Sequence, residues 1–204
     1  MSDSTVPTVV VTGLGVISSI GIGRHAYREG LETGRCGTSK VRSFDTSKFP
    51  SHIGGEVKNF EPDEWVSRLK PSDLGRSSQM AIAAAKSALQ DAGFSTAEAL
   101  PERCDVVMGT TDGEAQIFDD FVSSILKLEQ SEPPLHTAEA ISDAVMHELN
   151  LVGDAAVIAT ACAAGNYAIG YGYDKIRSGQ VNMSLCGGSA VSYTHLTLPT
   201  ICSV

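Results

Sequence analysis

The sequence predicts an α/β domain with a largely parallel sheet. Three observations support this prediction: short β-branched or aliphatic runs recur along the chain, helical stretches lie between most of them, and three of the runs end in or beside glycine. Strands that alternate with helices are typical of parallel sheets. Because 42% of the 204 residues are hydrophobic but only 6% are aromatic, we expect a core of aliphatic side chains and Ala.

The first expected elements are a strand and a helix. Residues 8–12 (TVVVT) are mostly β-branched and read as a buried strand that ends in the glycine turn 13–15. Residues 24–33 have helical composition and stop at Gly34. A short strand at 53–57 is expected within a mixed segment interrupted by Gly, Pro and Ser.

Residues 76–92 give the clearest helical pattern of the chain. Small and apolar residues recur there at three- and four-residue spacing, and Gly93 stands where a helix C-cap belongs. Since the apolar face is mostly Ala, this helix can lie close to its neighbour. Two further helices are expected at 115–129 and 138–149.

The remaining strands are short. Residues 105–110 (DVVMGT), 155–160 (AAVIAT) and 182–186 (NMSLC) are expected to form them. A turn at 161–163 follows the second of these strands, and 163–177 reads as a helix.

Composition excludes several classes of protein. The formal net charge is −9, and a net acidic surface repels phosphate backbones, so no nucleic-acid partner is expected. No apolar run approaches the ~20 residues of a membrane span, and the start lacks the basic region of a signal peptide. The five cysteines form no CxxC pair, which argues against a disulfide framework and a zinc site. We therefore expect a cytoplasmic protein that binds no metal.

The segment Gly13-Leu14-Gly15 admits a nucleotide-binding oxidoreductase as an alternative. It follows an expected strand, as a dinucleotide-binding fingerprint does, but Ser18 replaces the third glycine. No strand ending in Asp or Glu lies about 20 residues further on, as ribose recognition needs. The pattern favours a plain glycine turn that lets the chain pass close to other backbone.

Cys162 is the strongest candidate for a catalytic residue. It lies between an expected buried strand and a helix, with small residues on both sides that permit a sharp turn. The unpaired N–H groups and positive end of a helix favour a thiolate, the reactive form of cysteine. The helix that follows carries Gly165, Gly170 and Gly172, which suggests that other elements approach it closely. The alternative is a buried structural cysteine.

Residues 160–169 (TACAAGNYAI) resemble the active-site segment of β-ketoacyl-acyl-carrier-protein synthases, the condensing enzymes of fatty-acid and polyketide assembly. The resemblance runs from about Thr8 to Ala190 and includes 9–17, 79–85 and 187–189. It implies the N-terminal half of a thiolase-like fold, with layered helices on a mixed, mostly parallel five-stranded sheet.

The resemblance also implies a mechanism. Cys162 would hold an acyl group covalently while malonyl-carrier protein loses carbon dioxide and attacks it, a decarboxylative Claisen condensation. The implied partners are acyl carrier protein, acyl and malonyl thioesters, and a second subunit in a homo- or heterodimer; no cofactor is implied.

Two family segments that carry histidines are missing from this sequence, a His-Gly-Thr segment and one that follows a Gly-Phe-Gly-Gly turn. None of the five histidines has that context, so each is expected to be an ordinary residue: His25, His52, His136, His147 and His195. The chain is therefore expected to be incomplete and inactive alone. A non-catalytic, acyl-binding or structural fragment remains the alternative.

The last 14 residues differ in character. Residues 191–204 contain no Asp, Glu, Lys, Arg or Gly, and the family resemblance stops before them. We expect a synthase domain at 1–190 and an unrelated tail at 191–204, such as a frameshift or read-through product. The alternative is a final edge strand with an uncharged loop.

A basic cluster interrupts the acidic chain at Arg68, Lys70 and Arg76. The family resemblance implies a docking patch for acyl carrier protein, which is strongly acidic, and charge complementarity would mainly raise the association rate. The alternative is a solvated loop.

Overall fold

The computed structural model describes residues 8–94, 103–111, 113–127, 138–189 and 200–203. Its centre is a three-stranded parallel sheet in the order β6 (Ala155–Ile158), β5 (Cys104–Gly109), β7 (Met183–Gly188). All of β5 is buried. The predicted α/β domain with a largely parallel sheet is confirmed.

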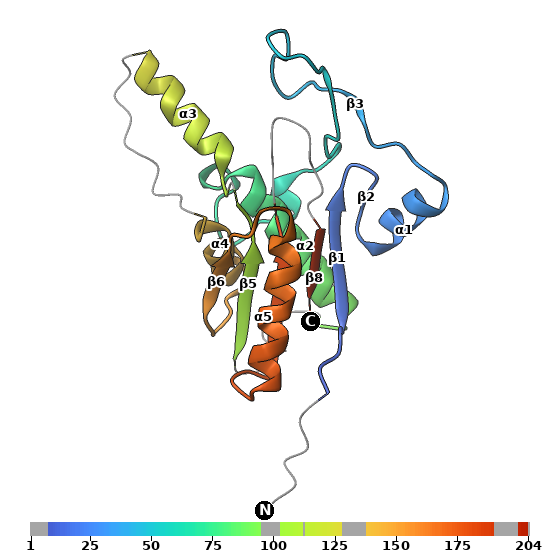
Figure 1. Cartoon of the computed structure of the whole chain (residues 1–204), viewed down its shortest axis with the longest axis vertical. Coiled ribbons are helices and arrows are strands. Elements are labelled where there is room, and N and C mark those ends of the chain that lie inside the picture. Colours follow the sequence, from blue (N-terminus) through green and yellow to red (C-terminus); the bar gives the residue numbers. More distant parts are fainter. Residues whose placement is uncertain (1–7, 95–102, 112, 128–137, 190–199, 204) are drawn as a thin grey trace, which may run out of the picture.

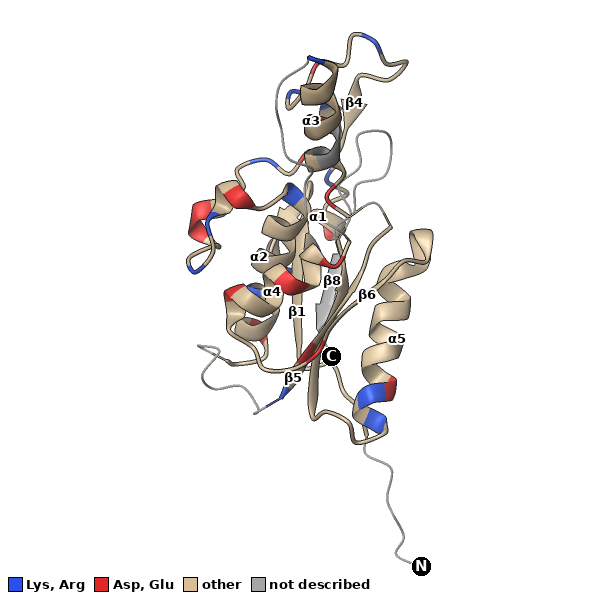
Figure 2. Ribbon diagram, turned by 90° about the vertical axis from the view of Figure 1, so that its left-hand side faces the viewer, with Lys and Arg blue, Asp and Glu red and all other residues tan. Residues whose placement is uncertain are grey.

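Helices cover both faces of this sheet. Helix α5 (Ala164–Arg177) lies on one face and α4 (Ala140–Leu149) on the other, and α2 (Arg76–Asp91) packs beside α4 (Figure 1, Figure 2). The apolar face of α2 is mostly Ala and fully buried, which lets the helix pack tightly on its neighbours. The helices expected at 76–92, 138–149 and 163–177 are confirmed within two residues at each end.

A second group of strands is antiparallel. Strand β1 (Gly13–Ser18) pairs with β2 (Gly21–Ile22) and with β8 (Thr200–Ser203). The strand expected at 8–12 is therefore misplaced, and its Val10 and Val11 are 60% and 57% exposed.

The glycines expected to form a turn lie inside β1 because α2 presses against them. A Cβ on Gly15 would lie 1.8 Å from the Ala84 carbonyl oxygen, and one on Gly13 would lie 2.1 Å from that of Ala88. The close approach of these glycines to other backbone was predicted correctly, but the glycines lie in a strand and not in a turn. Gly13 and Gly15 therefore do not form the phosphate-binding turn that the nucleotide-binding alternative requires.

The other elements are short or project from the body. They are α1 (Arg24–Glu32), β3 (Ser39–Lys40), β4 (Ile53–Gly54), the 3-10 turns η1 (Pro62–Glu64), η2 (Pro71–Asp73) and η4 (Ala161–Ala163), and α3 (Ala115–Leu126). Figure 1 shows α3 and the segment with β3 extending beyond the carboxyl ends of the parallel strands. The strand expected at 53–57 is only two residues long, and the helix expected at 115–129 ends at Leu126.

Residues 190–199 and 204 of the expected tail lie outside the described part of the chain. Residues 200–203 form β8, so the boundary at Ala190 stays a prediction. Within the described ranges, no helix is both long and apolar enough to cross a membrane.

Candidate active site

Cys162 lies in η4, at the carboxyl end of the parallel sheet, where β6 passes into α5. It is exposed, which excludes the buried structural cysteine considered above. The residue before it, Ala161, has φ +50°, a left-handed conformation that costs a non-glycine residue roughly 1–2 kcal/mol. The chain therefore makes the sharp strand-to-helix turn that the small residues predicted.

Three glycines let α5 begin directly on the ends of two strands. A Cβ on Gly109, the last residue of β5, would lie 2.2 Å from the Ala164 carbonyl carbon. A Cβ on Gly188, the last residue of β7, would lie 3.1 Å from the Gly165 Cα. Any side chain at Gly109 would push the first turn of α5 away from the sheet and move Cys162 with it.

The N-terminus of α5 has no side-chain cap and continues the 3-10 turn η4. The Ala163 N–H donates to the Thr160 carbonyl (3.2 Å), and the Ala164 N–H donates to the Ala161 carbonyl. The dipole of a helix favours negative charge beside its N-terminus. Cys162 lies in the turn directly before this terminus.

The exposed face of α5 carries aromatic side chains. Tyr167 is 60% and Tyr171 46% exposed, and a Cβ on Gly170 would meet nothing within 4 Å. Gly172, by contrast, faces β7, where a Cβ would lie 2.1 Å from the Cys186 Sγ. The predicted close approach to this helix is confirmed at Gly165 and Gly172, and in the described part of the chain Gly170 has no such neighbour.

An ion cluster with a buried Lys175–Asp105 pair and an exposed rim holds the other end of α5. The Lys175 ammonium pairs with the buried Asp105 of β5 and lies 3.1 Å from Asp154, and Arg103 lies 2.7 Å from Asp154. The hydrogen bond to Asp105 raises the pKa of Lys175, and the bond from Lys175 lowers that of Asp154. Sequence reasoning missed this cluster, although a carboxylate inside a strand is itself a signal that a cation lies nearby.

Glu114, directly before α3, belongs to a buried hydrogen-bond network at the start of α2. Its buried carboxylate accepts hydrogen bonds from the N–H groups of Ser78 (2.8 Å) and Ser77 (3.2 Å), capping α2. The Ser189 hydroxyl donates to the Ser77 carbonyl (3.0 Å), and the Ser189 N–H donates to the Gly109 carbonyl (3.1 Å). This network ties α2 to the carboxyl ends of β5 and β7. No local pattern along the chain indicates this network.

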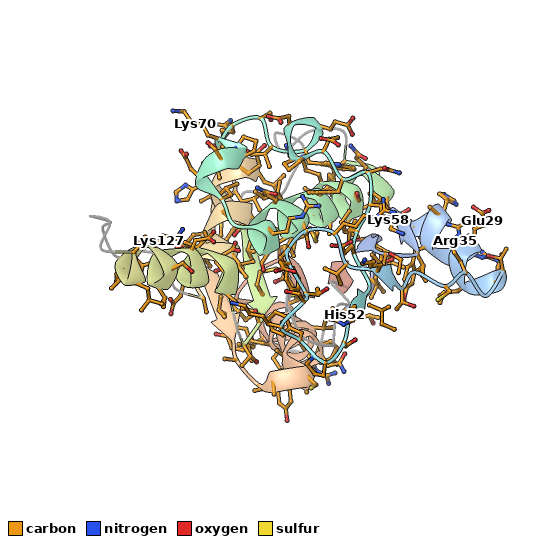
Figure 3. The ribbon with its side chains drawn as sticks, turned by 90° about the horizontal axis from the view of Figure 1, so that it is seen from above. Glu29, Arg35, His52, Lys58, Lys70 and Lys127 are labelled. Carbon is orange, nitrogen blue, oxygen red and sulfur yellow. The ribbon has the colours of Figure 1, made fainter. Side chains whose placement is uncertain are left out.

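The predicted basic cluster is divided by burial. Arg68 and Lys70 are exposed on the segment between η1 and η2, and Figure 3 places Lys70 at the outer edge of the molecule. Arg76 is half-buried, with its guanidinium 4.6 Å from the centre of the Phe60 ring. Burial lowers the pKa of Arg76, partly opposed by Glu61.

The histidines occupy ordinary positions where the structure describes them. His25 in α1 and His147 in the last turn of α4 are exposed, and a ring nitrogen of His52 lies 3.1 Å from the Thr46 hydroxyl. His136 and His195 lie outside the described ranges. No group of His, Cys, Asp and Glu that could hold a metal ion occurs among the residues that the structure covers.

The family profile described as "Beta-ketoacyl synthase, N-terminal domain" matches residues 7–202. The chain is 33% identical to 3-oxoacyl-[acyl-carrier-protein] synthase II, chloroplastic, of Arabidopsis thaliana over 189 residues. This alignment covers 89% of this chain and 35% of that protein. The chain is also 31% identical over 203 residues to the tetracenomycin polyketide synthase ketoacyl synthase alpha subunit of Streptomyces glaucescens. That alignment covers 93% of this chain and 47% of the subunit.

Solved structures give the same picture. The ishigamide ketosynthase/chain length factor matches with a TM-score of 0.83 and 40% identity over 90% of this chain and 47% of that one. The ketosynthase of the AntDE:AntF complex, solved with an acyl-carrier protein, matches with a TM-score of 0.69 and 25% identity. The match covers 90% of this chain and 45% of the ketosynthase chain. The predicted thiolase-like fold is confirmed, and the chain spans about half the length of these proteins or less.

Proposed function

Since this chain belongs to the β-ketoacyl synthase family, we propose that it is the nucleophile-bearing half of an enzyme that condenses an acyl thioester with malonyl-acyl-carrier protein. The observation that carries the proposal is the exposed Cys162 thiol at the uncapped N-terminus of α5. The relatives named above are a 3-oxoacyl-[acyl-carrier-protein] synthase and a ketoacyl synthase subunit of a polyketide synthase, and the proposal assigns the same reaction type to the whole enzyme of which this chain is a half.

The first half of the reaction uses the Cys162 turn. The thiolate attacks the carbonyl carbon of an acyl thioester and forms a tetrahedral oxyanion, for which the backbone N–H of Cys162 is the proposed donor. When the oxyanion collapses, the bond to the carrier's sulfur breaks, and the carrier thiolate leaves and takes up a proton. The product is an acyl group held on the Cys162 sulfur.

The second half needs groups beyond this chain. Malonyl-carrier protein loses carbon dioxide, the resulting enolate attacks the acyl carbonyl, and the Cys162 thiolate is released as the carbon–carbon bond forms. The enolate must be held by polarising donors. The family's two histidine segments, which would supply them, are missing from this sequence. Taken alone, the chain therefore accepts an acyl group without condensing it.

The exposed Arg68 and Lys70 are the proposed docking site for acyl carrier protein. They present positive charge on a chain with a net charge of −9, and the AntDE:AntF structure supports a carrier partner for the family. Arg76 lies at the start of the adjacent α2, but its half-buried guanidinium over Phe60 makes it the weaker contact.

Dimerisation and a cytoplasmic location complete the proposal. In the described part of the chain β6 pairs with β5 alone, so its other edge is available to a second subunit. Edge strands that present unpaired backbone groups are templates for pairing between chains.

Transfer of an acyl group to Cys162 tests the proposal. The 204-residue chain is incubated with a hexanoyl-loaded acyl carrier protein and its peptides are mapped by mass. We expect a hexanoyl adduct on the peptide that contains Cys162 and none in Cys162→Ala. Cys36→Ala, which removes another exposed thiol, should keep the adduct. A folded chain that is acylated elsewhere, or nowhere, would contradict the assignment of the nucleophile.

A further inference from the structure

We propose that Glu148 is a positioning residue that fixes the docking segment, defined as Ser67–Lys70, in the shape that acyl carrier protein binds. This inference rests on the proposed docking function of Arg68 and Lys70. Glu148 belongs to α4, about 80 positions away in the sequence, and its side chain is fully buried.

The Glu148 carboxylate accepts three consecutive backbone N–H groups of the docking segment. One oxygen accepts from Ser67 (2.8 Å), and the other accepts from Arg68 (2.9 Å) and Leu69 (2.9 Å). The Ser67 hydroxyl adds a fourth bond at 3.0 Å. A single side chain therefore fixes the backbone course of residues 67–69 and the place at which Lys70 follows.

Lys86 of α2 adds a cation to these contacts. Its ammonium donates both to the Glu148 carboxylate and to the Trp65 carbonyl, just before the docking segment. Glu148, Lys86 and the backbone groups that they bind are called the Glu148 clamp below. Since α2 and α4 pack on each other, the segment is fixed to this helix pair.

The clamp determines which side chains face the solvent. Val66 is buried and Leu69 is partly buried against the core, whereas Arg68 and Lys70 are exposed. If the backbone were released, the two cations would lose their fixed spacing and direction, although the charge on the surface would be unchanged. The energetic consequence would appear in carrier binding.

Charge and positioning predict opposite effects for Glu148→Gln. The substitution removes one negative charge, so the net charge changes from −9 to −8 and long-range electrostatics alone would tighten binding to an acidic protein. The amide, however, would point an N–H₂ group at backbone donors, and the segment would loosen. We expect the loosening to dominate.

The experiment measures binding of the 204-residue chain to an acidic acyl carrier protein in its apo form, which cannot react with Cys162. At low salt, Glu148→Gln should weaken binding about fivefold or more. Asp143→Asn removes the same charge from the exposed side of α4 and serves as the matched control, so its affinity should be unchanged or slightly higher. Amide exchange should accelerate at residues 67–69 in Glu148→Gln only.

A double-mutant cycle separates positioning from general destabilisation. In a background of Arg68→Glu with Lys70→Glu, Glu148→Gln should cause no further loss, because the cations it positions are gone. A loss of equal size in both backgrounds would overturn the inference. If Glu148→Gln does not fold, Glu148→Asp keeps the charge but shortens the side chain, and it should weaken binding in the same background-dependent way.

Two failures are distinguishable. If the charge reversal at Arg68 and Lys70 weakens binding but neither Glu148 variant does, the inference about Glu148 is wrong and the docking proposal stands. If the charge reversal itself leaves affinity unchanged at low salt, the docking proposal fails and the role of Glu148 in docking fails with it.

Discussion

Cys162 is exposed because of neighbouring residues that have no reactive side chain. The left-handed Ala161 turns the chain, and Gly109 and Gly165 leave room for α5 to begin against the strand ends. The other thiols with described side chains have different surroundings. Burial raises the pKa of Cys104 to about 12 and that of Cys186 to about 11, whereas hydrogen bonding to Thr38 lowers the pKa of the exposed Cys36.

These surroundings predict an order of alkylation. With limiting iodoacetamide at neutral pH, Cys162 should be modified first, Cys36 should follow, and the two buried thiols should stay unmodified while the chain is folded. Peptide mass mapping over time gives the order. Cys36 is the other exposed thiol among those described, so it is the residue to compare. Modification of Cys36 ahead of Cys162 would argue against a thiol activated by the α5 terminus.

Two glycines two residues apart in α5 give a matched pair of predictions. Gly172→Ala places a Cβ 2.1 Å from the Cys186 Sγ, so it should destabilise the chain by about 1–3 kcal/mol. Gly170→Ala meets nothing within 4 Å and should stabilise it by up to ~1 kcal/mol through helix propensity. Denaturant unfolding measures both. Equal effects would mean that α5 does not pack on β7 as described.

At the scale of elements, the sequence predicted most helices because each carries its own signal. The Ala spacing of α2 and the strand–helix alternation around Cys162 are local patterns, and local patterns are what a sequence displays. The position of β1 was wrong because Gly13 and Gly15 look like a turn until α2 is placed against them. Glu114 and Glu148 were missed because their partners lie 36–37 and 79–81 positions away.

The Glu148 clamp also predicts acid sensitivity for the contact between α4 and the docking segment. Burial alone would raise the pKa of Glu148, but hydrogen bonds from Lys86 and three backbone N–H groups hold it at about 2. A depressed pKa means that the stabilisation is present above the ordinary value of 4.5 and is lost as the pH falls toward 2. The loss should be roughly 3 kcal/mol.

Unfolding free energies measured by denaturant between pH 6 and pH 2.5 test this expectation. The parent chain should lose more stability over this range than Glu148→Gln, which has no carboxylate to protonate. Identical pH profiles for the two proteins would mean that Glu148 is not clamped.

At the scale of the whole molecule, the parallel sheet is covered on the α5 side by one helix that still exposes Tyr167 and Tyr171. The relatives are about twice as long as this chain or longer. Exposed aromatic side chains beside an open strand edge favour association. We therefore expect dimers or larger aggregates in light scattering, and a monodisperse monomer that melts cooperatively would contradict this expectation.

Condensation also depends on groups from the whole enzyme and not on Cys162 alone. Acylation needs a nucleophile and a reachable thioester, and Cys162 is the proposed nucleophile. Condensation needs in addition donors that polarise the malonyl carbonyl and hold the enolate, and losing a single oxyanion donor already costs ~10²–10³ in rate. Both family histidine segments are missing from this sequence, so the loss should be far larger, although such losses are not additive.

The expected phenotype is slow acyl transfer to Cys162 with no detectable β-ketoacyl product from radiolabelled malonyl-carrier protein. Adding a separately produced C-terminal half of a related ketosynthase should restore product, and Cys162→Ala should abolish the restored activity. Product formed at ordinary ketosynthase rates by the 204-residue chain alone would show that a histidine of this chain is catalytic. The exposed His25 and His147, each changed to Ala, would then be the first variants to measure, because their present positions assign them no chemistry.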